Sequence, residues 1–324
     1  MAVYSLVLVL VTVAGTLWSS RLGGERTPDP GNTTDVPSDP GGTPLALGAQ
    51  DTVVKSVTLP AGAPGSSLLF FDVQVEQTAT STTRAAMVSF RVNCSDADGN
   101  IEMQSTGKLS TNMFLAQGGA VSGQALTSET DQELRCDLLA SAPFAEPTED
   151  EESSLTLRAD LHTVPTTGAH LLALPRLDDA TLIEPGTNET VLSLRVEDPP
   201  ALDRMSTTVR LTSCTVVGGS RDAGENKCQE SMTGRESSTV RVRVIARWLD
   251  GKGAVAGTTT YWDETLAVDY NTHHFPWTLR QAGMADRVPE SAEAVVMVVQ
   301  VESLAGTPVV IHADGTDAVI TTHA

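Results

Sequence analysis

Basic residues are scarce in this sequence of 324 residues. Lys and Arg number 21 against 41 Asp and Glu, which gives a formal net charge of -20. This excess of negative charge opposes binding to nucleic acid and to anionic lipid, because both attract proteins largely through Lys and Arg. The one short basic stripe, formed by Arg241, Arg243 and Arg247, is better explained by pairing with acidic neighbours across a sheet. We therefore expect no nucleic-acid partner.

Motifs that identify common enzymes are also missing. The sequence has no nucleophile elbow, P-loop, Rossmann glycine pattern, HExxH motif or paired zinc-ligand motif. The segment 95–100 resembles a calcium loop, but Ile101 stands where that loop needs glycine. A hairpin turn at Asp98-Gly99 explains the segment better. His273 and His274 are adjacent, so on a strand they point to opposite faces and cannot easily share a metal. We therefore predict no catalytic residue, no metal site and no cofactor.

Long apolar runs are absent after residue 18, but one precedes it. Ala2–Trp18 carries no charge and is dominated by Leu, Val and Ala. As a helix it would be about 25 Å long, near the lower limit for crossing a bilayer. A cleaved signal peptide is the alternative, with small residues at 13–15 for cleavage but no Lys or Arg before the run. A buried core helix is a third interpretation. We expect residues 1–20 to be a signal anchor or signal peptide, and the membrane to be a partner through residues 2–18.

Residues 21–50 have too few apolar residues to form a core. They are rich in Pro, Gly, Asp and Thr, a composition typical of extended or disordered linkers. Behind an apolar anchor, such a segment would serve as a stalk. A disordered tail without a mechanical role is the alternative.

Long helical periods are absent as well, and alternation of apolar and polar residues takes their place from residue 51 onward. Segments 67–76 and 87–94 alternate in this way, which predicts half-buried strands. Val295–Val299 is continuously apolar, which predicts a central strand. Many short strands separated by turn residues are typical of sandwiches and barrels. We predict an all-β chain with two antiparallel β-sandwich domains in tandem, Ig-like or jelly-roll-like, at 51–175 and 185–324.

The sequence has only four cysteines, two in each predicted domain: Cys94, Cys136, Cys214 and Cys228. No pair has the two-residue spacing of a zinc knuckle or a thioredoxin-like motif. Two disulfides, Cys94–Cys136 and Cys214–Cys228, respect the predicted domain boundary and suit an exported chain. Free thiols in a cytoplasmic protein are the alternative, which Arg21 and Arg26 after the apolar run would favour. The cysteine pairing favours an extracytoplasmic protein, anchored or secreted.

Aromatic residues make up 4% of the sequence, yet they gather between residues 248 and 280. Aromatic rings beside carboxylates suit sugar rings, and two carboxylates about 5–10 Å apart suit glycoside hydrolysis. Packing in the domain core is the alternative explanation, because scarce bulky residues collect where packing needs them. The ligand-binding candidates are Tyr261, Trp262, Asp263, Asp269, Tyr270 and Trp277.

Taken together, these patterns predict an exported, membrane-tethered cell-surface interaction or structural protein without an evident catalytic site. Its partner would be a surface protein or a glycan. The alternative is an extracytoplasmic carbohydrate-binding protein or glycoside hydrolase that uses residues 261–277.

Overall fold

The computed structural model describes most of the chain after residue 41. The described residues are 42–46, 48–61, 66–76, 85–104, 109–114, 119–142, 154–164, 170–173, 180–197, 199, 202–214, 237–268, 274–284 and 287–322. Residues 41–324 form one compact unit. The predicted apolar segment at 1–20 and most of the predicted linker therefore lie outside the described residues. In the part of the chain that is described, no helix is long and apolar enough to cross a membrane.

The described residues form strands almost throughout, as the alternation predicted. The first eight strands are β1 (Thr43–Ala46), β2 (Gly48–Leu59), β3 (Leu68–Val75), β4 (Ala85–Ser95), β5 (Leu109–Phe114), β6 (Gly119–Leu126), β7 (Leu134–Ala142) and β8 (Ser154–Val164). The others are β9 (His170–Ala173), β10 (Ala180–Ile183), β11 (Asn188–Val196), β12 (Leu202–Ser213), β13 (Ser238–Leu249), β14 (Val255–Val268), β15 (Phe275–Ala282), β16 (Ala294–Ala305) and β17 (Val309–Thr322).

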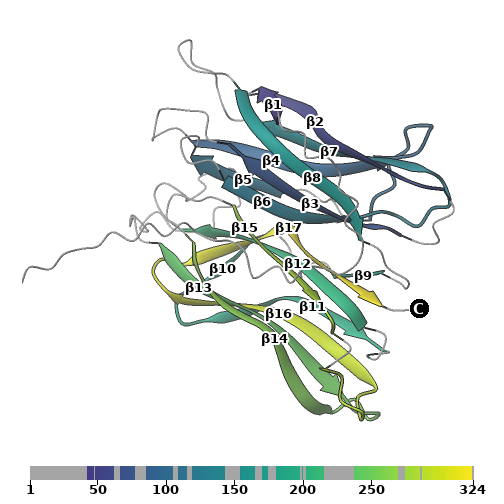
Figure 1. The fold of residues 1–324 in the computed structure, drawn as a ribbon. Coiled ribbons are helices and arrows are strands. Elements are labelled where there is room, and N and C mark those ends of the chain that lie inside the picture. The colour runs from purple at the N-terminus through teal and green to yellow at the C-terminus, as the bar shows by residue number, and fades with distance from the viewer. Residues whose placement is uncertain are drawn as a thin grey trace, which may run out of the picture. The chain divides into compact units, whose positions relative to one another are not determined.

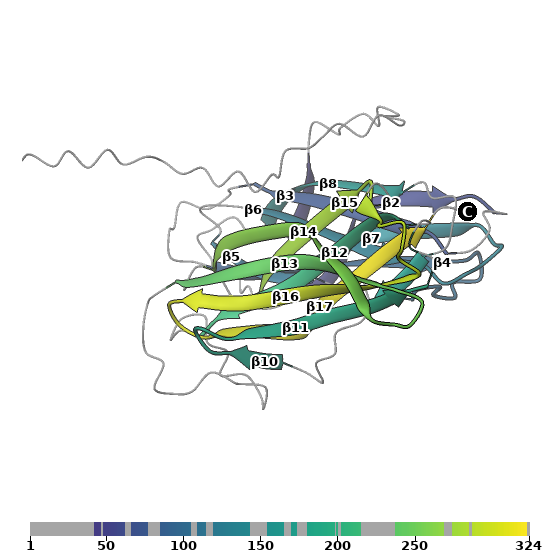
Figure 2. The same ribbon diagram turned by 90° about the horizontal axis from the view of Figure 1, so that it is seen from below.

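These strands pair antiparallel in four sheets (Figures 1 and 2). Sheet 1 has the order β2-β7-β4-β5, and sheet 2 has the order β1-β8-β3-β6. Sheet 3 has the order β10-β17-β12-β15, with β9 also pairing to β17, and sheet 4 has the order β11-β16-β13-β14. Sheets 1 and 2 take all their strands from residues 43–164, and we call them the N-terminal sheet pair. Sheets 3 and 4 use residues 170–322 and form the C-terminal sheet pair.

Each sheet pair encloses an apolar core, in a sandwich-like arrangement. In the N-terminal pair, Phe71 of β3, Phe90 of β4 and Leu138 of β7 are fully buried in one cluster. In the C-terminal pair, Trp248 of β13 is fully buried in a separate apolar cluster. Alternate residues of each strand supply these clusters, because successive side chains point to opposite faces of a sheet. The all-β prediction is confirmed at this level.

A third apolar cluster joins sheet 2 to sheet 3, and we call this contact the junction. Its members are Leu68, Phe70, Leu126 and Val164 from sheet 2 with Val319 and Leu172 from sheet 3. The run of four apolar residues at the start of β3 is explained by this contact. Leu69 and Phe71 face the N-terminal core while Leu68 and Phe70 face the junction, so both faces of the strand are buried.

A disulfide links Cys94 of β4 to Cys136 of β7, as predicted. The two residues lie directly opposite each other on the paired strands. Cys214 is also disulfide-bonded, and its predicted partner Cys228 lies outside the described residues.

Several strands differ from the sequence expectations. Strand β1 and the start of β2 lie within the predicted linker, where β1 pairs with β8 along the edge of sheet 2. Strand β6 was not expected, because its sequence GAVSGQAL has small side chains and no clear alternation. The segment Val295–Val299 lies in β16, between β11 and β13, which confirms its central position. The division into tandem domains stays a prediction.

Candidate functional site

The described aromatic residues between 248 and 280 lie in strands β13, β14 and β15 of the C-terminal sheet pair. Tyr261 and Trp277 are buried, at 7% and 4% relative exposure, and both belong to the core cluster. The Tyr261 hydroxyl donates a hydrogen bond to the Met284 carbonyl oxygen over 2.8 Å. The ring faces of these two residues are therefore used in packing.

A β-bulge explains why two neighbouring aromatic residues both turn inward. Trp262 is opposite Val244 and Thr260 is opposite Ile245, so Tyr261 has no partner residue on β13. An extra residue of this kind breaks the alternation of the strand. As a result Tyr261 is buried and Trp262 also packs against the core cluster. No local pattern in the sequence predicts the bulge.

Glu264 lies between two indole rings on the inner side of this edge. Its Oε2 accepts a hydrogen bond from Trp262 Nε1 over 3.0 Å and another from Trp277 Nε1 over 3.1 Å. Glu264 and Trp262 are two residues apart on β14, so their side chains share a face. Both are partly buried. The arrangement gives sheets 3 and 4 a polar contact at the edge where β14 and β15 lie.

Asp263 points to the other face of sheet 4. Its carboxylate accepts a hydrogen bond from Arg241 Nε over 2.6 Å and a second from Arg241 Nη2. The hydrogen bonds from Arg241 are the main reason that the pKa of Asp263 is below its usual value. Arg243 likewise pairs with Glu302 at 3.2 Å. These pairs confirm the predicted cross-strand role of Arg241 and Arg243. Asp263 and Glu264 point to opposite faces of sheet 4, so the sheet lies between their carboxylates.

Asp269 and Tyr270, the other two candidates, lie outside the described residues. A ligand-binding role for residues 261–277 therefore depends on partly buried Trp262 together with those two residues. It stays a prediction. In the described part of the chain, no three His, Cys, Asp or Glu side chains gather in a way that could hold a metal.

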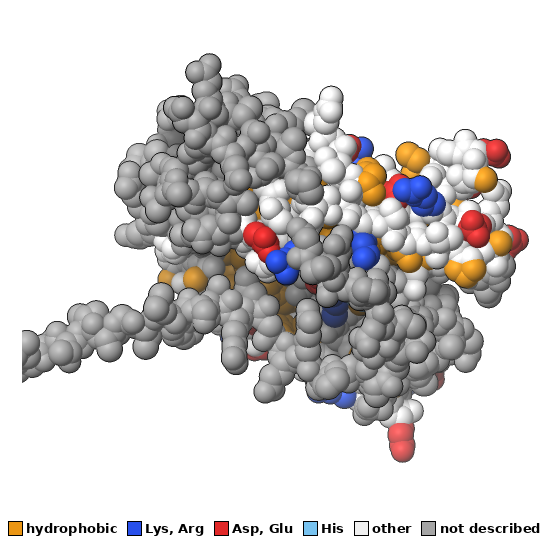
Figure 3. Space-filling model, turned by 45° about the horizontal axis from the view of Figure 1, so that its top comes forward, with side chains coloured by type: hydrophobic (Ala, Val, Ile, Leu, Met, Phe, Trp, Pro, Cys, Tyr) orange, Lys and Arg blue, Asp and Glu red, His pale blue; other side chains and the backbone are white. Residues whose placement is uncertain are grey.

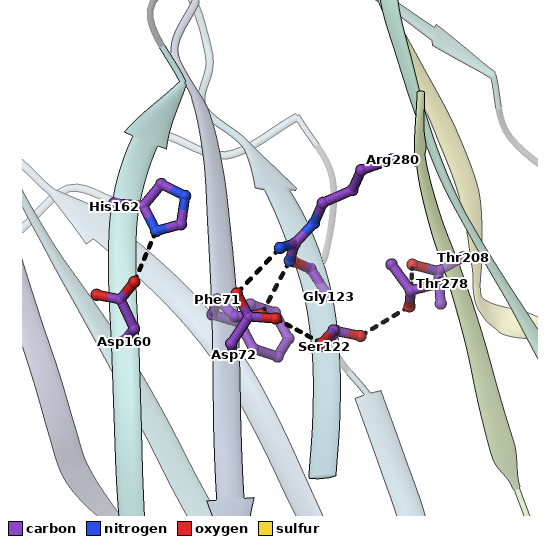
Figure 4. A network of polar contacts seen from close by, with 9 residues as sticks. All are labelled: Phe71, Asp72, Ser122, Gly123, Asp160, His162, Thr208, Thr278 and Arg280. Carbon is purple, nitrogen blue, oxygen red and sulfur yellow. Dashed lines mark hydrogen bonds and ion pairs between the residues drawn. The ribbon is translucent and has the colours of Figure 1, made fainter. Parts of the chain in front are cut away.

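The densest polar network lies elsewhere, at the junction (Figure 4). Arg280 of β15 extends from sheet 3 to sheet 2, where it donates to Asp72 Oδ2 over 2.9 Å. It also donates to the Phe71 carbonyl oxygen over 3.1 Å and to the Gly123 carbonyl oxygen over 3.0 Å. Its guanidinium lies 4.1 Å from the centre of the Phe70 ring. One side chain thus contacts two strands of the opposite sheet.

Hydroxyl groups extend the same network. Thr278 of β15 donates to the Ser122 carbonyl oxygen over 2.8 Å and lies 3.3 Å from the Thr208 hydroxyl of β12. The Ser122 hydroxyl donates to Asp72 Oδ1. Burial disfavours the ionised form of Asp72, but Arg280 and Ser122 outweigh this effect and hold its pKa below the usual value.

An exposed histidine lies beside this network on β8. His162 Nδ1 is 3.0 Å from Asp160 Oδ2 (Figure 4). The His162 ring meets the Phe70 ring edge-on with 6.0 Å between centres. Asp160 and His162 are both exposed at the surface of sheet 2.

A second junction contact joins Gln124 of β6 to Asp317 of β17. Gln124 Nε2 donates to Asp317 Oδ1 over 2.7 Å and to the Ser206 carbonyl oxygen over 3.3 Å. Burial raises the pKa of Asp317 to about 6, although the hydrogen bond from Gln124 acts in the opposite direction. Sequence reasoning missed both residues. The pattern that could have found Asp317 is a carboxylate next to a run of apolar residues, here residues 318–320.

Arginine and histidine side chains gather near one end of β12. Arg210 Nη2 donates to His274 Nδ1 over 2.7 Å, and its Nη1 lies 3.1 Å from Asp314 Oδ2. Because arginine can only donate, His274 Nδ1 accepts and the ring proton is on Nε2. His274 has φ of 62°, an uncommon value for a residue other than glycine. The His274 and His312 rings meet edge-on at 4.4 Å.

The segment that resembles a calcium loop is a turn. Asp96 Oδ1 accepts hydrogen bonds from the backbone N–H groups of Asp98 and Asn100 over 2.9 and 2.8 Å. Gly99 adopts φ of 83°, which suits glycine in a hairpin turn. The hydrogen bonds from Asn100 are the main reason that the pKa of Asp96 is below its usual value. The hairpin prediction is confirmed.

The described surface carries mixed charges. Figure 3 shows acidic and basic side chains interspersed on the described part of one face. Ion pairs of this kind on sheet 1 are Arg91–Asp51 and Arg135–Asp137. Exposed pairs of this type contribute little to stability.

The sequence matches no family model and no curated protein. Solved structures of low similarity share the all-β character. The glycosylasparaginase PNGase F from Flavobacterium meningosepticum is 11% identical with a TM-score of 0.37, over 87% of this chain and 93% of that one. The CBM22-1-CBM22-2 tandem domain of Xyn10C from Paenibacillus barcinonensis is 12% identical with a TM-score of 0.25, over 87% and 95%. A structure of infectious bursal disease virus is 10% identical with a TM-score of 0.27, over 80% and 57%. Values this low support no inference about activity.

Proposed function

We propose that the chain is an exported interaction or structural protein of the cell surface, tethered through residues 2–18 or released from them. Its body consists of two tandem β-sandwich domains, the N-terminal and C-terminal sheet pairs. The observation that carries this proposal is the Cys94–Cys136 disulfide, since disulfides persist in oxidising compartments and are rare in the cytosol.

Protease treatment of intact host cells tests this proposal. We expect added protease to digest an epitope-tagged chain in intact cells, and we expect a thiol reagent to label Cys94 and Cys136 only after reduction. A chain that is protected from protease, with cysteines labelled without reductant, would contradict export.

A second candidate function is carbohydrate binding at residues 261–277. It is favoured by partly buried Trp262, whose indole N–H is fixed by Glu264, since an ordered indole ring can stack on a sugar. Glycoside hydrolysis is less well supported. Asp263 and Glu264 lie on opposite faces of sheet 4 and cannot flank one glycosidic bond, so Asp269 would have to supply a carboxylate.

A glycan array separates the two candidates. The full chain and the Trp262→Ala variant are compared, with Arg247→Ala on the outer face of sheet 4 as the control. If residues 261–277 bind sugars, Trp262→Ala loses binding while Arg247→Ala retains it. If no glycan is bound by the native chain, or if both variants bind equally, the interaction candidate is kept and this site is rejected.

A further inference from the structure

The junction contains a carboxylate that has no charged partner among the described residues. Asp317 of β17 faces sheet 2, and burial and the hydrogen bond from Gln124 account for its pKa. Directly opposite on β12 is Thr208, a neutral residue. A carboxylate removed from water without a counter-ion is costly in its ionised form.

The charged groups on the neighbouring elements are paired with one another. Asp72 of β3 bonds to Arg280 of β15, and Asp160 bonds to His162 on β8. Arg210 of β12 pairs with Asp314 of β17, and His312 of β17 lies 2.7 Å from the Thr212 hydroxyl. None of these groups contributes to the pKa of Asp317.

An acceptor atom lies on the other side of the contact. Gln124 Oε1 is buried and has no hydrogen-bond partner among the described residues. It belongs to the same amide group whose Nε2 donates to Asp317. A protonated carboxyl group has an O–H donor as well as an acceptor, whereas an ionised one can only accept. Protonation of Asp317 therefore supplies the donor that Gln124 Oε1 lacks, and the two side chains can form a reciprocal pair.

We propose that Gln124 and Asp317 form a proton-operated latch between the two sheet pairs. The junction is held more tightly when Asp317 is protonated and loosens when Asp317 ionises. This property is independent of the partner that the surface protein binds.

The direction follows from linkage between protonation and opening. In the closed junction the pKa of Asp317 is about 6, against 3.8 for an unperturbed aspartate. Opening the junction exposes the carboxylate to water, so the closed form binds the proton more tightly than the open form. The latch is therefore fully engaged below the unperturbed pKa and is lost as the pH rises through about 6. Between pH 5 and pH 8 the equilibrium between closed and open junction should change by about tenfold.

Thiol labelling at the junction measures this opening in the full chain. Val164, which packs in the junction cluster at 7% exposure, is replaced by cysteine. The labelling rate of the folded protein by a neutral thiol reagent is divided by the rate in urea at the same pH, which removes the effect of thiol ionisation. We expect protection of the thiol to fall about tenfold from pH 5 to pH 8.

Two further variants in the same background identify the group responsible. Asp317→Asn keeps the shape, does not ionise and carries an N–H donor, so protection should stay within about twofold across this range. Asp131→Asn removes an exposed carboxylate and should retain the tenfold change.

Two outcomes would overturn the latch. One is protection that does not change with pH in the chain with native Asp317. The other is the same pH dependence in Asp317→Asn. Should Asp317→Asn fail to fold, the first outcome still decides the matter, because it needs only the native aspartate and the Asp131→Asn control.

Discussion

At the scale of single residues, Arg280 makes the most extensive contacts across the junction. Its guanidinium reaches a carboxylate, two carbonyl oxygens and an aromatic ring. A planar guanidinium with five N–H donors can make these contacts together, whereas the ammonium group of lysine is a compact charge that cannot. The position therefore requires the shape of arginine as well as its charge.

We expect Arg280→Lys to lower the free energy of unfolding by about 2 kcal/mol, since hydrogen bonds to buried carbonyl groups are lost. Urea denaturation followed by circular dichroism measures the change. Arg195→Lys is the matched control, because Arg195 pairs with Glu197 on an exposed surface. That variant should change stability by no more than about 0.5 kcal/mol. Equal effects of the two substitutions would show that Arg280 contributes only as a surface charge.

At the scale of elements, the packing of the Phe71 and Leu109 side chains over β6 depends on Gly123. A Cβ at this position would lie 2.6 Å from Leu109 Cδ1 and 2.7 Å from Phe71 Cε1. Both neighbours belong to the N-terminal core. The carbonyl group of Gly123 also accepts a hydrogen bond from Arg280, so a shift of β6 would disturb the junction too.

Gly123→Ala should therefore lower the free energy of unfolding by about 1–3 kcal/mol through overpacking. The control is Gly257→Ala in β14, where the added Cβ would meet only Trp248 Cδ1 at 3.7 Å. That variant should fold with nearly unchanged stability. Thermal unfolding of both variants checks the pair, and a stable Gly123→Ala would mean that the Phe71 and Leu109 side chains can shift without loss.

The disulfide connects two strands, β4 and β7, through cysteines that are 42 residues apart in the sequence. Closing a loop of this length in the unfolded chain is worth about 4 kcal/mol in the chain-entropy account. We expect the double variant Cys94→Ala with Cys136→Ala to lose stability of that order, measured by urea denaturation without reductant. A loss below about 1 kcal/mol would indicate that the bridge contributes little to the folded state.

At the scale of the whole molecule, two carboxylates set opposite limits on stability as the pH changes. The pKa of Asp72 lies below its usual value, so its contribution is present above the unfolded pKa and is lost as the pH falls through the folded pKa. The pKa of Asp317 is raised to about 6, so its contribution is present in acid and is lost as the pH rises through that value.

We therefore expect the free energy of unfolding to be greatest near pH 4 and to decline as the pH rises from about 4 to about 6. Urea denaturation at a series of pH values tests this. Asp317→Asn should flatten the decline between about pH 4 and pH 6, and Asp72→Asn should flatten the decline below pH 4 while lowering stability at neutral pH. A native profile that rises steadily from pH 4 to pH 8 would contradict the assignment of Asp317, and one that does not fall below pH 4 would contradict the assignment of Asp72.

Part of this molecule could be predicted from its sequence. Alternation of apolar and polar residues predicted β3 and β4, because this pattern depends on residues close in sequence. The Cys94–Cys136 bridge could be predicted because the sequence has few cysteines, two in each predicted domain. The junction could not be predicted. Gln124 and Asp317 are 193 residues apart, and nothing local marks them as neighbours. The bulge at Tyr261 could not be predicted either. The Tyr261 ring, a ligand-binding candidate in the sequence, is buried in the structure.

The position of β17 in sheet 3 has a consequence for synthesis of the chain. Residues 43–164 contain every strand of sheets 1 and 2, so the N-terminal sheet pair can form while the later residues are still being made. Until β17 arrives, Leu68, Phe70 and Leu126 lack the cover of Val319. A nascent chain stopped before β17 would expose this apolar surface to chaperones and proteases. Strand β17 thus completes the junction, and only a chain that includes it buries this apolar surface.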